Sequence, residues 1–265
     1  MNVFWREIKA NRKALLIWCI GIVLFMISGM AKYEGYTTSA QSINEMMAKM
    51  PSSLKAIFGM GTFDLTTVTG YFGLLFFYLA LMAAIHASML GASIISKEER
   101  DKTAEFLFIK PVSRNKVITS KLLASVVNIV IFNLVTLASS LVMVRHYSKG
   151  EEIVGEITRL MLGMFILQLI FLFIGSAIAA VSNHPRTAPS LATGILLLTF
   201  ILSIVIDMNS RIESLKYFTP FKYFDAKNLM YGPGFQTVYL ILSFALIAVL
   251  SGATYAFYKN RDLHI

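Results

Sequence analysis

The stretch "YFGLLFFYLALMAAIHASMLGASII", residues 71–95, contains no Asp, Glu, Lys or Arg. About 20 apolar residues in an α-helix are enough to cross the hydrocarbon core of a bilayer. The Gly, Ala and Ser residues within the stretch suit close packing against other membrane helices. We therefore predict that residues 71–95 form a transmembrane helix and that the chain is an integral membrane protein.

Further runs of the chain share this length and this lack of charge, which makes a bundle of six transmembrane helices the predicted fold. The composition agrees, because 56% of the 265 residues are hydrophobic and 15% are charged, whereas soluble domains are about a quarter charged. We expect an all-α fold in which residues 1–265 form a single transmembrane domain. The other predicted spans are residues 14–30, 122–144, 160–181, 189–206 and 238–258.

The first of these runs is predicted to be a retained helix and not a cleaved signal peptide. A basic segment precedes it, as in signal peptides, but "SGMAKYEG" after it is a poor cleavage site and further spans follow. Residues 1–13 place Trp5 and neighbouring apolar residues largely apart from the basic ones. This pattern favours an interfacial N-terminal helix, with a simple basic anchor as the alternative.

Lys and Arg concentrate in alternate connecting segments. With a cytoplasmic N-terminus, the inside segments hold 14 Lys or Arg and 6 acidic residues, against 10 and 9 in the outside segments. Because Lys and Arg near span ends favour the cytoplasmic side, we predict that both termini are cytoplasmic. The net charge of +9 then reflects topology, and we expect no nucleic-acid partner.

The sequence lacks motifs for catalysis or for binding nucleotides and metals. It contains neither G-x-x-x-x-G-K-[ST], which holds nucleotide phosphates, nor the H-E-x-x-H of zinc proteases. The four His residues have no ligand spacing, and the single cysteine, Cys19, lies in an apolar run. We therefore expect no catalytic residue, no metal and no cofactor on this chain, and we expect that it is not an enzyme.

The charged segment "SKEERDKTAEFLFIKPVSRNKVITSK", residues 96–121, joins two predicted spans. Its start has the pattern of a new helix, because Ser96 and Glu99 have the spacing of a capping box. Glu98 and Lys102 are spaced i,i+4 in the order that stabilises a helix. The segment therefore predicts a short helix that begins at Ser96.

The second half of this segment indicates where that helix ends. Pro111 cannot continue a helix, and Ser113 can cap the next one, which leads into the third span. The apolar residues 104–109 lie between the charges. They suit either a solvated loop whose aromatic side chains reach the lipid headgroups or a helix that docks on a cytoplasmic partner, and we favour docking.

The stretch "SKEERDKTAEFLFIKPVSRNKVITSKLLA" resembles the first cytoplasmic loop of ABC-2 type transporter permeases. "MPSSLKAIFGMGTFDLTTVTGYFG" is similar to the large external loop of that family, and "LKYFTPFKYFD" followed by "GPG" is similar to its segment between spans five and six. The family more often has Gly where this chain has Lys102. The matching positions in the first stretch are Glu98, Glu99, Arg100, Thr103, Glu105, Pro111, Val112, Ser113, Arg114 and Lys121.

The resemblance implies a function that the composition does not reveal. It implies a permease subunit in a bacterial plasma membrane that pairs with a second permease copy or paralogue. A cytoplasmic P-loop ATPase would bind ATP and Mg²⁺, and the loop 96–121 would couple that ATPase to outward movement of an amphipathic drug, peptide or lipid-like substrate. The coupling residues implied are Glu98, Glu99, Arg100, Lys102, Thr103, Glu105, Phe106, Leu107 and Pro111.

Four amide or imidazole side chains lie within the predicted spans, and they form a possible intramembrane polar site. Polar groups in a membrane are candidates for function, although they also commonly hydrogen-bond across helix pairs. We favour the structural role for all of them and regard His86 as the one to test. They are His86, Asn128, Asn133 and Gln168.

Other classes of membrane protein fit the sequence less well. A secondary transporter usually carries a charged group within the membrane to couple ions, and the predicted spans have none. An ATP-independent channel or a membrane scaffold stays open as an alternative, and the absence of an ATPase partner would distinguish it. The aromatic-rich segment 207–237 is expected to form a belt at the outer interface.

Overall fold

The computed structural model describes residues 3–38, 40–60, 63–102, 113–148, 153–182 and 184–260. These residues form helices and connecting turns without a strand. Six helices are long and apolar enough to cross a membrane, and each predicted span lies within one of them, which confirms the all-α six-span fold. The long helices are α1 (Val3–Ala31), α5 (Val68–Arg100), α7 (Arg114–Tyr147), α8 (Val154–Val181), α9 (Ala188–Met208) and α11 (Thr237–Asn260).

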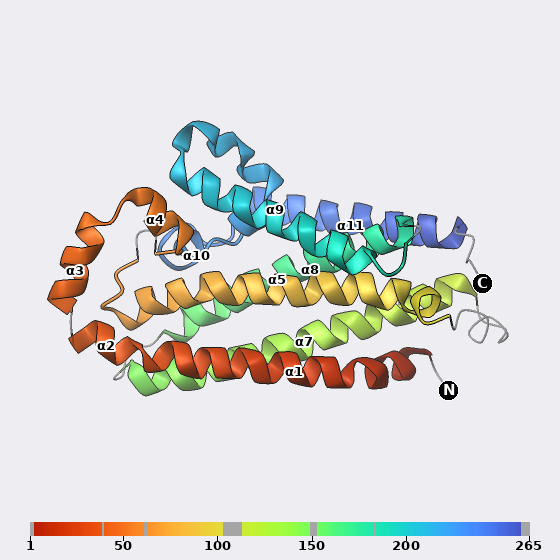
Figure 1. Cartoon of the computed structure of the whole chain (residues 1–265), viewed down its shortest axis with the longest axis horizontal. Coiled ribbons are helices and arrows are strands. Elements are labelled where there is room, and N and C mark those ends of the chain that lie inside the picture. The colour runs from red at the N-terminus through yellow and green to blue at the C-terminus, as the bar shows by residue number, and fades with distance from the viewer. Residues whose placement is uncertain are drawn as a thin grey trace.

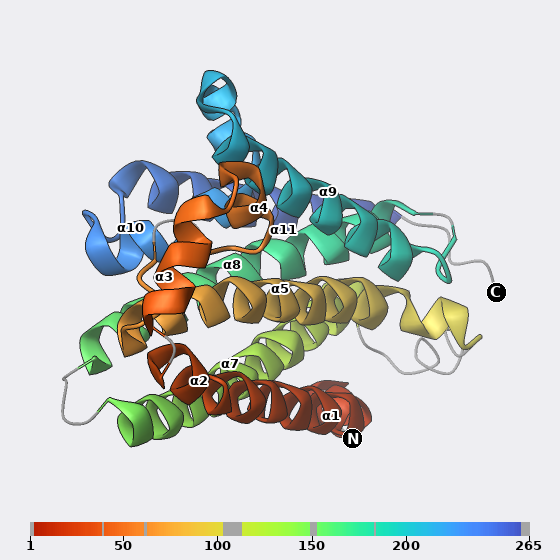
Figure 2. The same cartoon turned by 60° about the vertical axis from the view of Figure 1, so that its left-hand side comes forward.

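The long helices lie side by side in three layers (Figures 1 and 2). α1 and α7 form one outer layer, α9 and α11 form the other, and α5 and α8 lie between them. α1 begins, α5 ends, α7 begins and α11 ends at the same end of the bundle (Figure 1), which we call the basal end. The side of a membrane that this end faces stays a prediction.

Short helices cover the opposite end, which we call the distal end (Figure 1). Three precede α5 in the chain and three lie between α9 and α11. The "SINEMMAKM" segment, whose methionine spacing is helical, falls largely within one of them. They are α2 (Tyr33–Thr38), α3 (Ala40–Lys49), α4 (Ser52–Ile57), the 3₁₀ helices η1 (Ser210–Phe218) and η2 (Pro220–Lys222), and α10 (Ala226–Tyr231).

The two central helices approach closely because glycines face each other across their contact. A Cβ atom on Gly91 of α5 would lie 2.1 Å from the carbonyl oxygen of Leu172 on α8. A Cβ atom on Gly175 of α8 would lie 2.3 Å from the carbonyl oxygen of Ser88 on α5. Small residues of this kind let the backbones of membrane helices pack directly. α5 and α8 therefore form the core on which the outer helices pack.

The outer helices expose apolar side chains along their length. Ile17 on α1, Leu198 on α9 and Val249 on α11 each have more than two-thirds of their surface exposed. An apolar surface of this extent on a helix suits contact with lipid and not with water.

The N-terminal segment differs from the expected interfacial helix. Residues 3–31 form one continuous α-helix, so the basic segment extends the first span and does not turn away from it. Phe4 and Ile8 pack on the buried apolar cluster at the basal end. These contacts align the segment with the bundle, which gives it a structural role that its charge pattern alone does not reveal.

Candidate functional site: a charged cluster at the base of the α5–α7 loop

The charged end of α5 continues the second span. Ser96 lies inside α5, and its Oγ donates a hydrogen bond to the carbonyl oxygen of Ala92 at 2.8 Å. The predicted capping box at Ser96 is therefore wrong, because a serine within a helix can bond to the preceding turn instead of capping a new one. The helix ends only at Arg100, with Asp101 as its C-cap.

Lys102 follows this C-cap in the left-handed region, with φ of 53°. Its N–H donates to the carbonyl oxygen of Glu99 at 3.2 Å, as expected directly after a helix C-terminus. The predicted Glu98–Lys102 helical pair is thus wrong, because Lys102 lies outside the helix and Glu98 bonds elsewhere. A residue with positive φ is typically glycine, which accounts for the Gly that the family more often has here.

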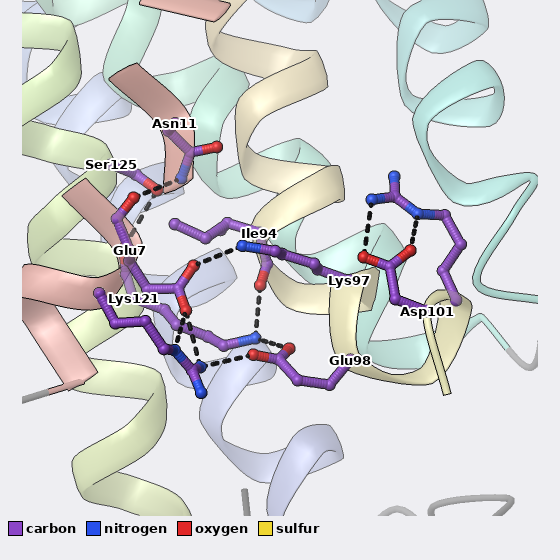
Figure 3. Close-up of polar contacts among 10 residues, drawn as sticks. Glu7, Asn11, Ile94, Lys97, Glu98, Asp101, Lys121 and Ser125 are labelled. Atoms are coloured by element: carbon purple, nitrogen blue, oxygen red, sulfur yellow. Dashed lines mark hydrogen bonds and ion pairs between the residues drawn. The ribbon is translucent and has the colours of Figure 1, made fainter. Parts of the chain in front are cut away.

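Glu98 points into the protein and joins three helices. One of its carboxylate oxygens accepts a hydrogen bond from Nη2 of Arg6 on α1 at 2.9 Å. The other accepts from Nζ of Lys121 on α7. Nζ of Lys121 also donates to the carbonyl oxygen of Ile94 on α5, at 2.6 Å. Figure 3 shows these groups converging between the helices.

A second carboxylate, that of Glu7 on α1, completes the cluster. Nη2 of Arg6 donates to it at 2.7 Å, and Nζ of Lys97 on α5 lies 3.4 Å from its other oxygen. The backbone carbonyl of Glu7 accepts from the side chain of Asn11. We call Arg6, Glu7, Lys97, Glu98 and Lys121 the basal cluster; it contains three cations and two anions.

The basal cluster is largely buried. Glu7 and Lys121 are fully buried and Glu98 is 5% exposed, whereas Arg6 and Lys97 retain partial contact with solvent. Burying a charge costs several kcal/mol unless a counter-charge and hydrogen bonds compensate. Each buried charge here has an opposite partner, so removal of one member would leave a buried charge without compensation.

Further bonds connect α11 to the same end. Nη1 of Arg114, at the start of α7, donates to the carbonyl oxygen of Lys259 at 2.9 Å. The hydroxyls of Thr119 and Tyr255 are 2.8 Å apart. Ser113 accepts a hydrogen bond from the N–H of Lys116 at 3.3 Å, which confirms its predicted role as the N-cap of α7. Both ends of the loop are therefore anchored in the bundle.

The coupling residues implied by the resemblance have different environments. Glu98 faces inward, Glu99 is half-buried, and Lys102 is exposed. Arg100 pairs with Asp101 at 2.9 Å, apart from the basal cluster (Figure 3), and its hydrogen bond lowers the pKa of the Asp101 carboxyl. The remaining members lie outside the described residues: Thr103, Glu105, Phe106, Leu107 and Pro111.

Sequence reasoning did not identify the basal cluster, although a signal for it was present. Glu98 stands three residues after the second predicted span, and Lys121 directly precedes the third. Opposite charges at the ends of two consecutive spans can meet when the loop between them folds back. The roles of Arg6 and Glu7 depend on α1 lying beside α7, which no local pattern reveals.

Two of the four polar residues within the spans meet. Nδ2 of Asn133 on α7 donates to Oε1 of Gln168 on α8, and Nε2 of Gln168 donates to the carbonyl oxygen of Ala83 on α5 at 3.3 Å. Asn128 bonds within its own helix, where its Nδ2 donates to the carbonyl oxygen of Ala124 at 2.7 Å. Contacts of this type stabilise membrane helices by about 1 kcal/mol each.

His86 lies in an aromatic environment. Its ring stacks on Phe132, with centroids 4.8 Å apart, and lies 5.4 Å from the ring of Trp18. The Nδ1 atom is buried without a hydrogen-bond partner in the part of the chain described. In the described part of the chain, no hydrogen bond joins His86 or Asn128 to the Asn133–Gln168 pair, and no group of three or more His, Cys, Asp or Glu could hold a metal ion.

The comparisons with known proteins agree with the fold. No curated protein matches the chain. The family described as "ABC-2 family transporter protein" matches residues 1–263, which is nearly the whole chain. With six apolar helices, the protein is a multi-pass membrane protein, and the match over this length shows that the chain belongs to the ABC-2 transporter family.

Proposed function

We propose that this chain is the membrane-spanning permease subunit of an ATP-driven exporter. A separate cytoplasmic P-loop ATPase would bind ATP and Mg²⁺, and a second permease copy or paralogue would complete the transporter in the plasma membrane. The substrate would be an amphipathic drug, peptide or lipid-like compound that moves outward. Membership of the ABC-2 family supports the permease role, since permeases of this family generally work with an ATPase subunit.

The observation that carries the proposal is the position of the basal cluster beneath the α5–α7 loop. Glu98 at the end of α5 and Lys121 near the start of α7 bond to each other and, through Arg6, to α1. A displacement of the loop would therefore move three helices together, because separating them would leave buried charges without partners. This is the property required of a loop that transmits the closure of an ATPase to the membrane.

The first experiment is affinity purification of the tagged chain from native membranes in mild detergent, followed by mass spectrometry. We expect a P-loop ATPase to co-purify. Combined Arg100→Ala and Lys102→Ala changes, and separately Phe106→Ala, should release it, because Arg100 ends α5 and Lys102 and Phe106 belong to the chain segment that follows it. Glu98→Ala is unsuitable for this purpose, because loss of this buried carboxylate would disrupt the bundle itself.

Lys216→Ala provides the matched control, because Lys216 lies in η1 at the distal end and pairs only locally with Glu213 at 2.9 Å. Its variant should retain the ATPase. Recovery of a second, differently tagged copy would assign the homodimer, whereas recovery of a homologous permease would assign the heterodimer. If no ATPase co-purifies with the unaltered chain under any condition, the proposal fails and an ATP-independent channel or scaffold takes its place.

A further inference from the structure

A pocket of about 320 Å³ opens at the distal end, far from the basal cluster. This volume lies at the lower end of the range for small-molecule sites. α4, α5, α8, α9 and the segment from η2 to α10 all contribute to its wall.

Aromatic rings form most of the inner wall. The Phe77 and Phe200 centroids are 5.1 Å apart, as are those of Phe200 and Phe221. Deeper in the pocket, Phe76 and Leu167 are almost fully buried, and Ala80 is 8% exposed. Phe221 was expected in an interfacial belt with the other aromatics of 207–237, but it packs on Phe171 and Phe200 inside the bundle.

A helix C-terminus fixes α4 over this wall. The N–H of Gly59 donates to the carbonyl oxygen of Ala56, and the N–H of Met60 donates to that of Lys55 at 2.9 Å. These two bonds form a Schellman motif, which places Gly59 at a positive φ of 67°. A Cβ atom at Gly59 would lie 2.6 Å from the ring of Phe77. Glycine therefore lets the turn that carries Lys55 rest directly on the aromatic wall.

Charged side chains from α4, α9 and the segment from η2 to α10 also line the pocket, and we call them its charged rim. Nζ of Lys222 pairs with the carboxylate of Asp207. Lys55 and Lys227 also line the pocket, and they form no salt bridge in the described part of the chain. The remaining anion is Asp225, and burial raises the pKa of its carboxyl group. The rim therefore carries three cations and two anions; Lys222 pairs with Asp207, which leaves two lysines against one carboxyl group.

We propose that this distal pocket binds an amphiphile that has an apolar body and an anionic head group. The apolar body would lie among Phe76, Phe77 and Phe200, and the head group would bind Lys55 and Lys227 at the rim. Charge complementarity favours an anionic head group. Lys222 is paired with Asp207, and Lys55 and Lys227 outnumber the one remaining carboxyl group of the rim. The inference narrows the substrate class of the proposed exporter, but the binding itself requires no ATPase.

The test uses the purified full chain in nanodiscs of phosphatidylcholine. The probe is a 12-carbon alkyl sulfonate that carries a photoreactive diazirine at the end of its tail, so that its head stays anionic at every pH used. A compound with the same tail and a trimethylammonium head group is the cationic comparison probe. After illumination, mass spectrometry locates and quantifies the labelled residues as a function of probe concentration.

We expect saturable labelling of the pocket phenylalanines by the sulfonate and at least tenfold weaker labelling by the ammonium compound. Combined Lys55→Glu and Lys227→Glu changes should raise the half-saturating concentration of the sulfonate at least tenfold. Lys49→Glu is the matched control, since Lys49 is an exposed lysine of α3 that does not line the pocket. Ala80→Phe should block the inner pocket and abolish labelling, with thermal unfolding measured in parallel to verify folding.

Equal labelling by both probes, or labelling that never saturates, would overturn the proposal, because either result indicates partition into the bilayer only. Adding phosphatidylglycerol to the nanodiscs distinguishes two sources of the same chemistry. Competition by this lipid would assign the site to an anionic membrane lipid, and lack of competition would assign it to a free amphiphile. Failure to bind the sulfonate would leave ATPase co-purification unaffected, so the two proposals fail independently.

Discussion

The ammonium group of Lys121 donates to the carboxylate of Glu98, and both groups are buried where the loop between α5 and α7 begins and ends. Twenty-three residues separate the two in sequence. The pair fixes the stems of the loop to each other independently of the conformation of the loop itself. A partner protein that binds the loop would therefore act on the ends of α5 and α7, which this ion pair already joins.

Glu98→Gln should destabilise the protein by about 3–5 kcal/mol, because it leaves the fully buried Lys121 without a counter-charge. Lys121→Met should cost less, because Glu98 would retain its bond to Arg6. The double variant should lose less free energy of unfolding than the sum of the losses in the two single variants. Equilibrium unfolding in mixed micelles measures all of these values.

Asp101→Asn is the control for this series. It removes one partner of the exposed Arg100–Asp101 pair, and the expected loss is about 0–1 kcal/mol. An equal loss for Glu98→Gln and Asp101→Asn would show that the basal cluster does not stabilise the bundle.

Lys102→Gly should stabilise the protein by about 1 kcal/mol, because an L-residue in the left-handed region pays a steric cost that glycine avoids. Lys102→Val should destabilise it, because a β-branched side chain tolerates positive φ poorly. Both changes remove the same charge, so comparing their unfolding transitions isolates the backbone effect. The same stability for both variants would contradict the left-handed conformation.

Gly91→Ala should separate α5 from α8 and destabilise the protein by about 1–3 kcal/mol, because the new methyl group would overlap the carbonyl oxygen of Leu172. Gly252→Ala in α11 is the matched control, since a Cβ atom there meets nothing within 4 Å. The control should be neutral or slightly stabilising, because alanine favours helix over glycine. Similar unfolding curves for the two variants would argue against the close α5–α8 contact.

His86→Phe should retain the fold and transport, because a phenyl ring can occupy the space between Trp18 and Phe132 without a buried nitrogen that lacks a partner. Its stability should equal or exceed that of the unaltered chain. Reconstitution with the co-purified ATPase and measurement of export provide the second readout. Loss of export with an unchanged fold would instead assign a functional role to His86.

Asp225→Asn should increase stability at neutral pH. Burial raises the pKa of this carboxyl, with Lys222, Asp207 and Lys227 as the neighbouring charges. The folded state therefore binds the proton more tightly than the unfolded state, and the stability from the protonated form falls as pH rises through the raised pKa. In unfolding measured from acid to neutral pH, this part of the pH dependence should disappear in the variant. An unchanged profile would contradict the raised pKa.

The sequence was sufficient for the six spans because each is a long apolar run without charge, and no soluble structure accommodates six of them. It also located the N-cap at Ser113, since that signal depends only on neighbouring residues. Ser96 has the same local chemistry as Ser113, yet it lies inside a helix. The difference is tertiary, because Lys97 and Glu98 find partners on α1 and α7 that stabilise further turns of α5.

The charged rim, and the contribution of α1 to the basal cluster, were beyond sequence reasoning for a related reason. Arg6 and Glu98 are 92 residues apart, and Lys55 reaches the same pocket as Lys227 only because α4 and α10 both fold over the distal end. Each of these residues looks like an ordinary surface charge in its own segment. Their function follows from helix packing, which a single sequence does not encode in any local pattern.

α5 is continuous from Val68 to Arg100, so one helix lines the distal pocket with Phe76 and bonds in the basal cluster through Glu98. At a rise of about 1.5 Å per residue, these two points are roughly 33 Å apart along the helix axis. When a continuous helix tilts, each point on it is displaced in proportion to its distance from the pivot. A small tilt imposed where α5 meets the loop becomes a larger sideways displacement of the aromatic wall, which would widen or narrow the space between α5 and α9.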